Sequence, residues 1–167
     1  AMEQQSFAYD TRIQVGTGAT VLIGEFVDSL INSNAPTVKE GVDCQILEIE
    51  EPIEVPTSDF EGTGLTTIKQ VSRHLSPREM IRIELEDGSS VKVTRNHPFW
   101  AVKNGSLELV DAEEVTASDY VVSMNTGKID RQERDYLEDL ASATGARKWF
   151  QDLTLKRIAR TSTVPYS

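Results

Sequence analysis

The chain has one cysteine, Cys44, so it cannot form an intrachain disulfide, and neither a disulfide scaffold nor a cysteine-rich zinc site fits. Long hydrophobic runs are also missing: the largest, such as Val21–Ile23, are far too short to cross a bilayer. The opening AMEQQSFAYD has neither the basic nor the apolar region of a secretory signal. We therefore expect no membrane association and a reducing, cytoplasmic setting, with Cys44 packed in the core.

Basic residues are scarce: 17 lysines and arginines stand against 27 aspartates and glutamates, for a net charge of -10. A surface this acidic repels phosphate backbones, so we expect no nucleic-acid partner. Solubility alone explains the charge. Adaptation to a salty cytosol, where salt screens the repulsion, is the sharper alternative. The acidic stretch 48–54 lacks metal-ligand spacing, and we expect no metal and no cofactor.

Turn residues recur between β-branched runs along the 167 residues, which predicts one compact, mainly β domain. Apolar spacing predicts a helix within 24–34, and Asp87-Gly88 predicts a hairpin turn. The prolines and glycines of 52–64 predict a loop or a bent edge. A charged helix is expected at 129–141, in an inserted or linking element. The expected strands are 11–15, 19–22, 44–49, 66–72, 80–85, 91–93, 99–102, 120–122 and 153–161.

Three segments carry a recognisable pattern, in order along the chain. SFAYDTRIQV, residues 6–15, begins with a serine and has an acidic residue before a strand. VKVTRNHPFW, residues 91–100, contains a Thr-x-x-His motif at the end of a strand, followed by Pro98. DAEEVTASDYVV, residues 111–122, leads into another strand, with Ser118 where glycine is common. Together these segments resemble an intein, a domain that excises itself from a host protein and joins the flanking segments.

The resemblance implies the Hedgehog/intein (HINT) fold, a horseshoe-like, mainly β fold with one or two short helices, whose termini meet in a central cleft. It divides the chain into a host remnant (1–5), a splicing domain (6–124), a linker or insert with a polar helix (125–150) and a return strand (151–167). The family's C-terminal His-Asn motif does not follow. We expect a second fragment to supply it, or the chain to have been cut.

The first step of splicing is an acyl transfer within one chain. The resemblance implies that the side chain of Ser6 attacks the carbonyl of Gln5 and turns the amide into an ester. Ser6 is either natural or a replacement for cysteine. His97 would donate a proton to the leaving nitrogen, because the pKa of histidine lies near the working pH. Thr94 would hydrogen-bond the same peptide group and orient it.

Other polar residues receive smaller roles. Asn96 is expected to add a polar contact at the site. Asp10 is expected to cap the local turn, with tuning of the site as the alternative. His74 is interpreted as a surface strand residue. No Gly-Asp signature of a homing endonuclease is present, so we expect a mini-intein without nuclease activity.

The expected partners are the chain's own flanking extein and a complementary C-terminal intein segment. AMEQQ at residues 1–5 resembles part of archaeal MCM replicative helicases, which suggests the host; the alternative is a cloning remnant. Two other functions stay open. One is an autoprocessing domain of the same fold that cleaves only its N-terminal junction. The other is a non-enzymatic β-rich binding module, in which the pair Thr94 and His97 is coincidental.

Overall fold

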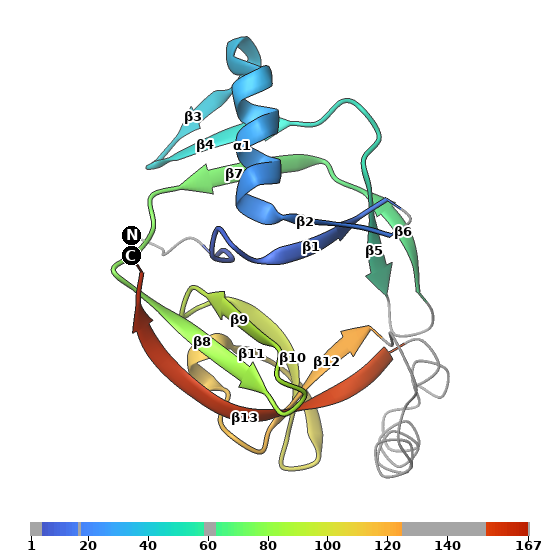
Figure 1. Cartoon of the computed structure of the whole chain (residues 1–167), viewed down its shortest axis with the longest axis vertical. Helices are drawn as coiled ribbons and strands as arrows, with labels where there is room; N and C mark the ends of the chain where they lie inside the picture. The colour runs from blue at the N-terminus through green and yellow to red at the C-terminus, as the bar shows by residue number, and fades with distance from the viewer. Residues whose placement is uncertain (1–4, 17, 59–62, 125–152, 167) are drawn as a thin grey trace.

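The computed structural model describes residues 5–16, 18–58, 63–124 and 153–166, which form a mainly β fold with one α-helix (Figure 1). This confirms the expected fold class. The elements are β1 (Arg12–Val15), β2 (Ala19–Leu22), α1 (Ile23–Ser33), η1 (Ala35–Thr37), β3 (Lys39–Gly41), β4 (Cys44–Glu48), β5 (Glu54–Ser58), β6 (Thr63–Thr67), β7 (Gln70–His74), β8 (Glu79–Leu85), β9 (Ser90–Val93), β10 (Pro98–Lys103), β11 (Ser106–Asp111), η2 (Ala112–Glu114), β12 (Tyr120–Met124) and β13 (Leu153–Pro165).

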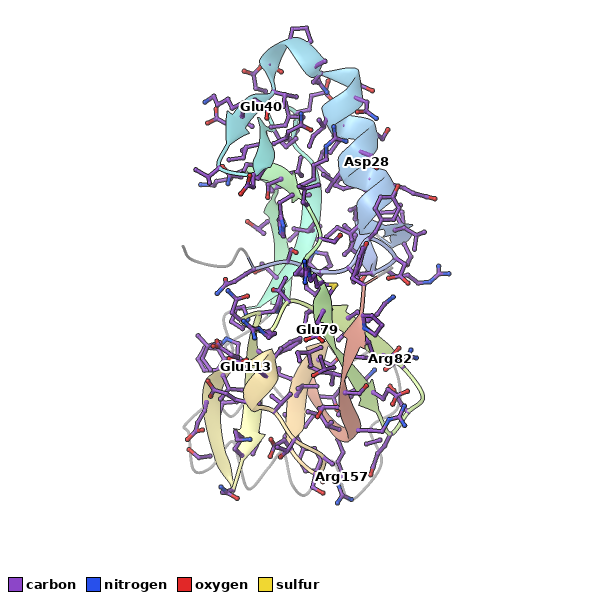
Figure 2. All side chains as sticks on the ribbon, turned by 90° about the vertical axis from the view of Figure 1, so that its left-hand side faces the viewer. Asp28, Glu40, Glu79, Arg82, Glu113 and Arg157 are labelled. Atoms are coloured by element: carbon purple, nitrogen blue, oxygen red, sulfur yellow. The ribbon has the colours of Figure 1, made fainter. Side chains whose placement is uncertain are left out.

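The strands form two parts with β1 and β2 between them (Figure 1). One part is a six-stranded sheet in the order β11-β10-β12-β13-β8-β9, and the other is the three-stranded sheet β3-β4-β7, packed against α1. Figure 2 shows both parts from the side, with Asp28 and Glu40 in the upper one and Arg82 and Arg157 in the lower one. Strand β13 pairs with β12 in its first half and with β8 in its second, so it joins the β11-β10-β12 half of the lower sheet to the β8-β9 half.

Each part has its own hydrophobic core. In the lower sheet, the buried residues Ile83, Val93 and Ile158 are among those that pack together. In the upper part, α1 presents Val27 and Ile31, four residues apart on one helical face, to the sheet residues of β4 and β7. Fully burying a side chain of this size contributes about 1.5–3 kcal/mol, so packing rather than capping holds α1 in place.

The N-terminus of α1 is completed by the chain segment that precedes β1. Leu22 makes no side-chain cap. Instead the N–H of Ile23 donates to the carbonyl of Thr11 (2.8 Å), and the N–H of Gly24 donates to that of Tyr9 (2.9 Å). These two bonds satisfy helix donors that otherwise lack partners. They also fix the path of residues 9–11, only a few residues after Ser6.

One strand prediction was wrong: the expected strand 66–72 is broken, because β6 ends at Thr67 and β7 begins at Gln70. For the segment 52–64, predicted as a loop or a bent edge, the structure has the edge strand β5, which pairs with β6 in a two-stranded ribbon. Pro56 fits there because a two-stranded ribbon has free edges, where a missing N–H costs little. The helix predicted at 129–141 lies outside the described residues.

Turn chemistry places two of the hairpins. Asn104 and Gly105 both have positive φ (52° and 78°), as a two-residue hairpin turn requires, and they join β10 to β11. Gly88 (φ 89°) follows Asp87 in the turn between β8 and β9. A hydrogen bond from Lys156, with others from Ser89, lowers the pKa of Asp87 to about 2, and the Lys156 ammonium lies 2.8 Å from the carboxylate.

The loop before β12 is held by a buried carboxylate. Asp119 accepts hydrogen bonds from Lys103 Nζ (2.5 Å) and from the N–H of Thr116 (2.9 Å). Burial raises the pKa of Asp119, but the hydrogen bonds from Lys103 and Thr116 lower it further, so the net shift is downward. The neighbouring Ser118 has φ 78°, a left-handed conformation that glycine adopts more easily. This explains why glycine is common at that place in the resembled family.

Candidate functional site

The N-terminal segment lies against the end of β9. Phe7 forms an isolated antiparallel bridge with Val93, and the N–H of Ala8 donates to the carbonyl of Lys92 (2.9 Å). One step further, the N–H of Thr94 donates to the carbonyl of Ser6 (3.0 Å). The chain just after the Gln5–Ser6 bond is thereby fixed as a short added strand.

The Gln5–Ser6 amide itself is held by a side chain. The N–H of Ser6 donates to the hydroxyl oxygen of Thr94 (3.0 Å). Thr94 is only 3% exposed, so its hydroxyl is a fixed acceptor rather than a solvated one. The contact expected between Thr94 and this peptide group is therefore present in the structure. Because the backbone N–H of Thr94 also donates to the carbonyl of Ser6, Thr94 binds both backbone polar groups of Ser6.

His97 stands at the other end of a tight turn that begins at Thr94. Its N–H donates to the carbonyl of Thr94 (3.0 Å), and its carbonyl accepts from the N–H of Ala112 (2.8 Å). The turn is therefore anchored to η2 as well as to β9. This arrangement brings a residue three positions after Thr94 back over the N-terminal segment.

The imidazole of His97 lies between two aromatic rings. Its ring centroid is 4.4 Å from that of Phe7 and 5.0 Å from that of Phe99. Nδ1 is 3.1 Å from the carbonyl oxygen of Pro98, so Nδ1 carries the proton and Nε2 is the atom that exchanges one. Burial lowers the pKa of His97, and the Pro98 carbonyl raises it by less. The neutral form is favoured, and it binds a proton only weakly.

The remaining expected residues lie around this centre. Gln5 is exposed, and Asn96 is half-buried within the turn between Thr94 and His97. Asp10 lies in the turn after Ala8, and its carboxylate is 3.2 Å from the ammonium of Lys92. Asp10 thus fastens the N-terminal segment to β9, and it does not line the pocket described next.

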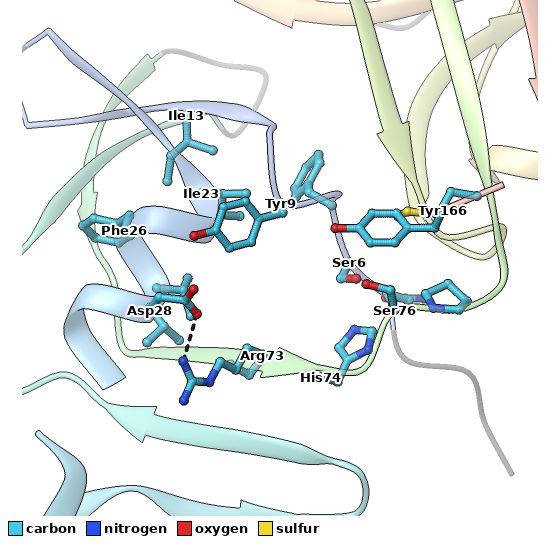
Figure 3. A pocket seen from close by; sticks show the side chains of 18 of the residues that line it. Ser6, Tyr9, Ile13, Ile23, Phe26, Asp28, Arg73, His74, Ser76 and Tyr166 are labelled. Atoms are coloured by element: carbon cyan, nitrogen blue, oxygen red, sulfur yellow. Dashed lines mark hydrogen bonds and ion pairs between the residues drawn. The ribbon is translucent and has the colours of Figure 1, made fainter. Parts of the chain in front are cut away.

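A pocket of about 370 Å³ opens on one side of the Gln5–Ser6 bond. Both residues line it, together with Tyr9 and Tyr166 (Figure 3). Tyr166 follows β13, and its N–H donates to the carbonyl of Arg78 (3.0 Å). The two ends of the described chain therefore meet at one cavity. In the same pocket wall, Arg73 of β7 and Asp28 of α1 form an ion pair of 2.8 Å.

His74 is the last residue of β7, which agrees with its interpretation as a strand residue, and it also lines this pocket. It is half-buried at the end of β7, and Figure 3 shows its ring beside the pocket near Ser6 and Ser76. β7 ends there and the chain turns towards β8, which carries the side chain inwards. His74 pairs with Cys44 of β4. Cys44, which was expected to pack in the core, is half-buried.

Within the described residues, no group of three or more His, Cys, Asp or Glu side chains is placed to hold a metal ion. None of the helices described is long and apolar enough to span a membrane. Around the Gln5–Ser6 bond, Thr94 holds the amide, Ser6 and His74 line the pocket, and His97 packs against Phe7.

Parts of several known proteins are similar to this chain in sequence. No family model matches the chain. A DNA polymerase of Thermococcus kodakarensis is 31% identical over 103 residues, covering 60% of this chain and 6% of the polymerase. The transcription initiation factor IIB of Methanocaldococcus jannaschii is 28% identical over 105 residues, covering 61% of this chain and 15% of the factor. The chain thus spans a small part of the curated relatives it matches.

The solved structures are similar over almost the full chain. The PabCDC21-1 intein has a TM-score of 0.76 at 16% identity, covering 99% of this chain and 85% of that one. A KlbA intein precursor from Methanococcus jannaschii has a TM-score of 0.76 at 20% identity, covering 99% and 78%. The transcription factor IIB Mvu mini-intein has a TM-score of 0.72 at 22% identity, covering 96% and 84%. These likenesses confirm the expected HINT fold.

Proposed function

We propose that the chain is an intein that performs protein splicing and begins by moving the Gln5 acyl group onto Ser6. The observation that carries this proposal is the hydrogen bond from the Ser6 N–H to the buried Thr94 hydroxyl. It holds one particular peptide bond of an N-terminal segment in a fixed orientation beside a pocket. An ordinary chain start has no reason to be held in this way, whereas a scissile bond does.

In the proposed step, Ser6 Oγ bonds to the carbonyl carbon of Gln5, and the bond from that carbon to the Ser6 nitrogen breaks. The nitrogen leaves as an amine and takes up one proton, and the hydroxyl loses one. Because burial lowers the pKa of His97, its protonated form is a stronger acid than an ordinary imidazolium and is suited to donate to that nitrogen. The turn that begins at Thr94 fixes the imidazole against Phe7, the residue that follows Ser6.

The fold of the solved neighbours supports splicing over a simple binding module, because those structures are of inteins. Tyr166 lines the same cavity as Gln5, so a segment that continues after Tyr166 would start close to the Gln5–Ser6 bond, as splicing requires. An autoprocessing domain that cleaves only its N-terminal junction would need the same Thr94 and His97 geometry. The residues after Ser167 in the parent protein decide between the two.

The test uses the chain with a folded reporter domain fused before Ala1 and the parent sequence after Ser167 attached. Hydroxylamine cleaves esters and thioesters, so it should release the reporter at Gln5. His97→Ala should abolish this release. Ser6→Ala should abolish it as well, since no ester can form. Loss of the reporter from the Ser6→Ala variant, or an inert parent under folding conditions, would refute the proposal.

The partners and setting belong to the same proposal. The chain would act on its own flanking extein, complete itself with a C-terminal segment, and carry out no nuclease reaction. The polymerase and factor IIB matches give no support to an MCM helicase host, which rests on AMEQQ alone. A halophilic origin rests on the net charge of -10. It predicts that folding strengthens from low to molar salt, and a flat response in denaturation curves would contradict it.

A further inference from the structure

His74 lines the pocket at the proposed reaction centre, and the acyl transfer described above gives it no role. Its Nδ1 is 2.9 Å from the carbonyl oxygen of Leu75. A carbonyl only accepts, so Nδ1 carries a proton and donates it. In the neutral ring this leaves a lone pair on Nε2. The structure therefore fixes the tautomer in which Nε2 can take up a proton.

That Nε2 atom is buried without a hydrogen-bond partner among the described residues. A buried polar atom left unpaired costs about 1–3 kcal/mol, so such an atom requires an explanation. His74 and Ser6 line one pocket, and Figure 3 shows the His74 ring facing the region of Ser6 and Ser76. The Ser6 hydroxyl is a donor in the same pocket, of the kind that would satisfy Nε2.

The chemistry of Ser6 requires such a partner. A serine hydroxyl is hardly ionised near neutral pH and needs a base to become a nucleophile, whereas a cysteine thiol is already a few per cent thiolate. Asp10 is paired with Lys92 and lies outside the pocket. His97 is already assigned the opposite task, the donation of a proton to the leaving nitrogen. Asp28 lines the pocket but is paired with Arg73, so His74 is the group in this pocket best suited to the role.

We propose that His74 is the general base of the acyl transfer, accepting the Ser6 hydroxyl proton on Nε2. As Oγ bonds to the carbonyl carbon of Gln5, its proton moves to Nε2 of His74. As the carbon–nitrogen bond breaks, the Ser6 nitrogen takes a proton from His97. One proton is removed and one is delivered, and exchange with water returns both imidazoles to their starting forms. This proposal rests on the proposed splicing function and adds a second histidine to it.

The experiment measures the rate at which hydroxylamine releases the reporter from the fusion described above, with either serine or cysteine at position 6. His74→Asn keeps an amide donor for the Leu75 carbonyl and removes the base. Positioned general bases contribute about 10²–10⁴-fold, so His74→Asn should slow release about 100-fold or more with Ser6. In the Ser6→Cys background, which needs a base less, the same change should slow release less than about 10-fold. Leu109→Ala, a change at an exposed side chain of β11 outside this pocket, should leave both rates unaltered.

Each outcome has one meaning. Equal slowing by His74→Asn in both backgrounds would assign His74 a structural role and overturn the proposal, and so would unaltered rates. Release from neither the Ser6 nor the Ser6→Cys parent would refute the splicing function itself, which keeps the two failures apart. Thermal unfolding of every variant shows whether a slow one is folded. If His74→Asn is unfolded, His74→Gln, which places a non-basic amide near Nε2, is judged by the same comparison.

Discussion

The hydroxyl of Thr94 offers the sharpest test of the site. Thr94→Val keeps the shape of the side chain and removes the acceptor of the Ser6 N–H. Thr94 is 3% exposed, so water cannot easily replace the lost partner. Leaving a donor unsatisfied costs about 1–3 kcal/mol when buried, and Ser6 is only half-buried, so we expect a loss of about 1–2 kcal/mol in stability.

The same change should slow the acyl transfer. If Thr94 fixes the amide for attack, a loss of about 1–2 kcal/mol in the transition state corresponds to roughly 5- to 30-fold in rate. Hydroxylamine release of the reporter measures the rate, and urea denaturation measures the stability. Thr94→Ser, which keeps a hydroxyl, should recover most of both.

Thr154→Val is the matched control. Thr154 is buried in β13 at 7% exposure, and its hydroxyl has no partner among the described residues. Removing an unpaired buried hydroxyl should be neutral or slightly stabilising, and the rate should not change. If Thr94→Val costs no more stability and no more rate than Thr154→Val, the hydrogen bond to Ser6 does not orient the peptide, and the reasoning fails.

Three further changes follow from the structure. Burial lowers the pKa of His97, so the unfolded chain binds a proton at His97 more tightly than the folded chain does, and the free energy of unfolding falls as the pH drops below about 6.5. His97→Gln should flatten this fall between pH 7 and 5, as measured by urea denaturation. An unaltered pH profile would argue against the burial of His97 as its cause. A Cβ at Gly24 would overlap the Tyr9 ring, so Gly24→Ala should lower stability by about 1–3 kcal/mol. This loss is expected although alanine favours a helix over glycine by about 1 kcal/mol. A higher melting temperature of the variant would show that the Tyr9 ring moves away freely. Ser118→Gly should add roughly 0.5–1 kcal/mol by relieving the left-handed backbone, and a lower urea midpoint would mean that the lost bond to Arg157 weighs more.

The sequence predicted the elements whose signal is local. The Asp87-Gly88 turn, the alternation in β8 and the apolar spacing of α1 each depend on residues close together in the chain, so they could be identified without a structure. The break within 66–72 and the β5–β6 ribbon could not be identified in this way, because β-branched residues are equally typical of one long strand and of two short ones. Which strands pair is decided by contacts between distant segments.

By itself the sequence determined the composition of the site: a serine, a Thr-x-x-His turn and their order along the chain. Their spacing fixes the turn from Thr94 to His97, because one short loop sets that geometry. Only the tertiary structure decided that β9 receives residues 6–8 as an added strand, and that Tyr166 returns to the same cavity. It also decided the place of His74, because the inward direction of a strand-end side chain follows from packing between the two sheets, which no local pattern records.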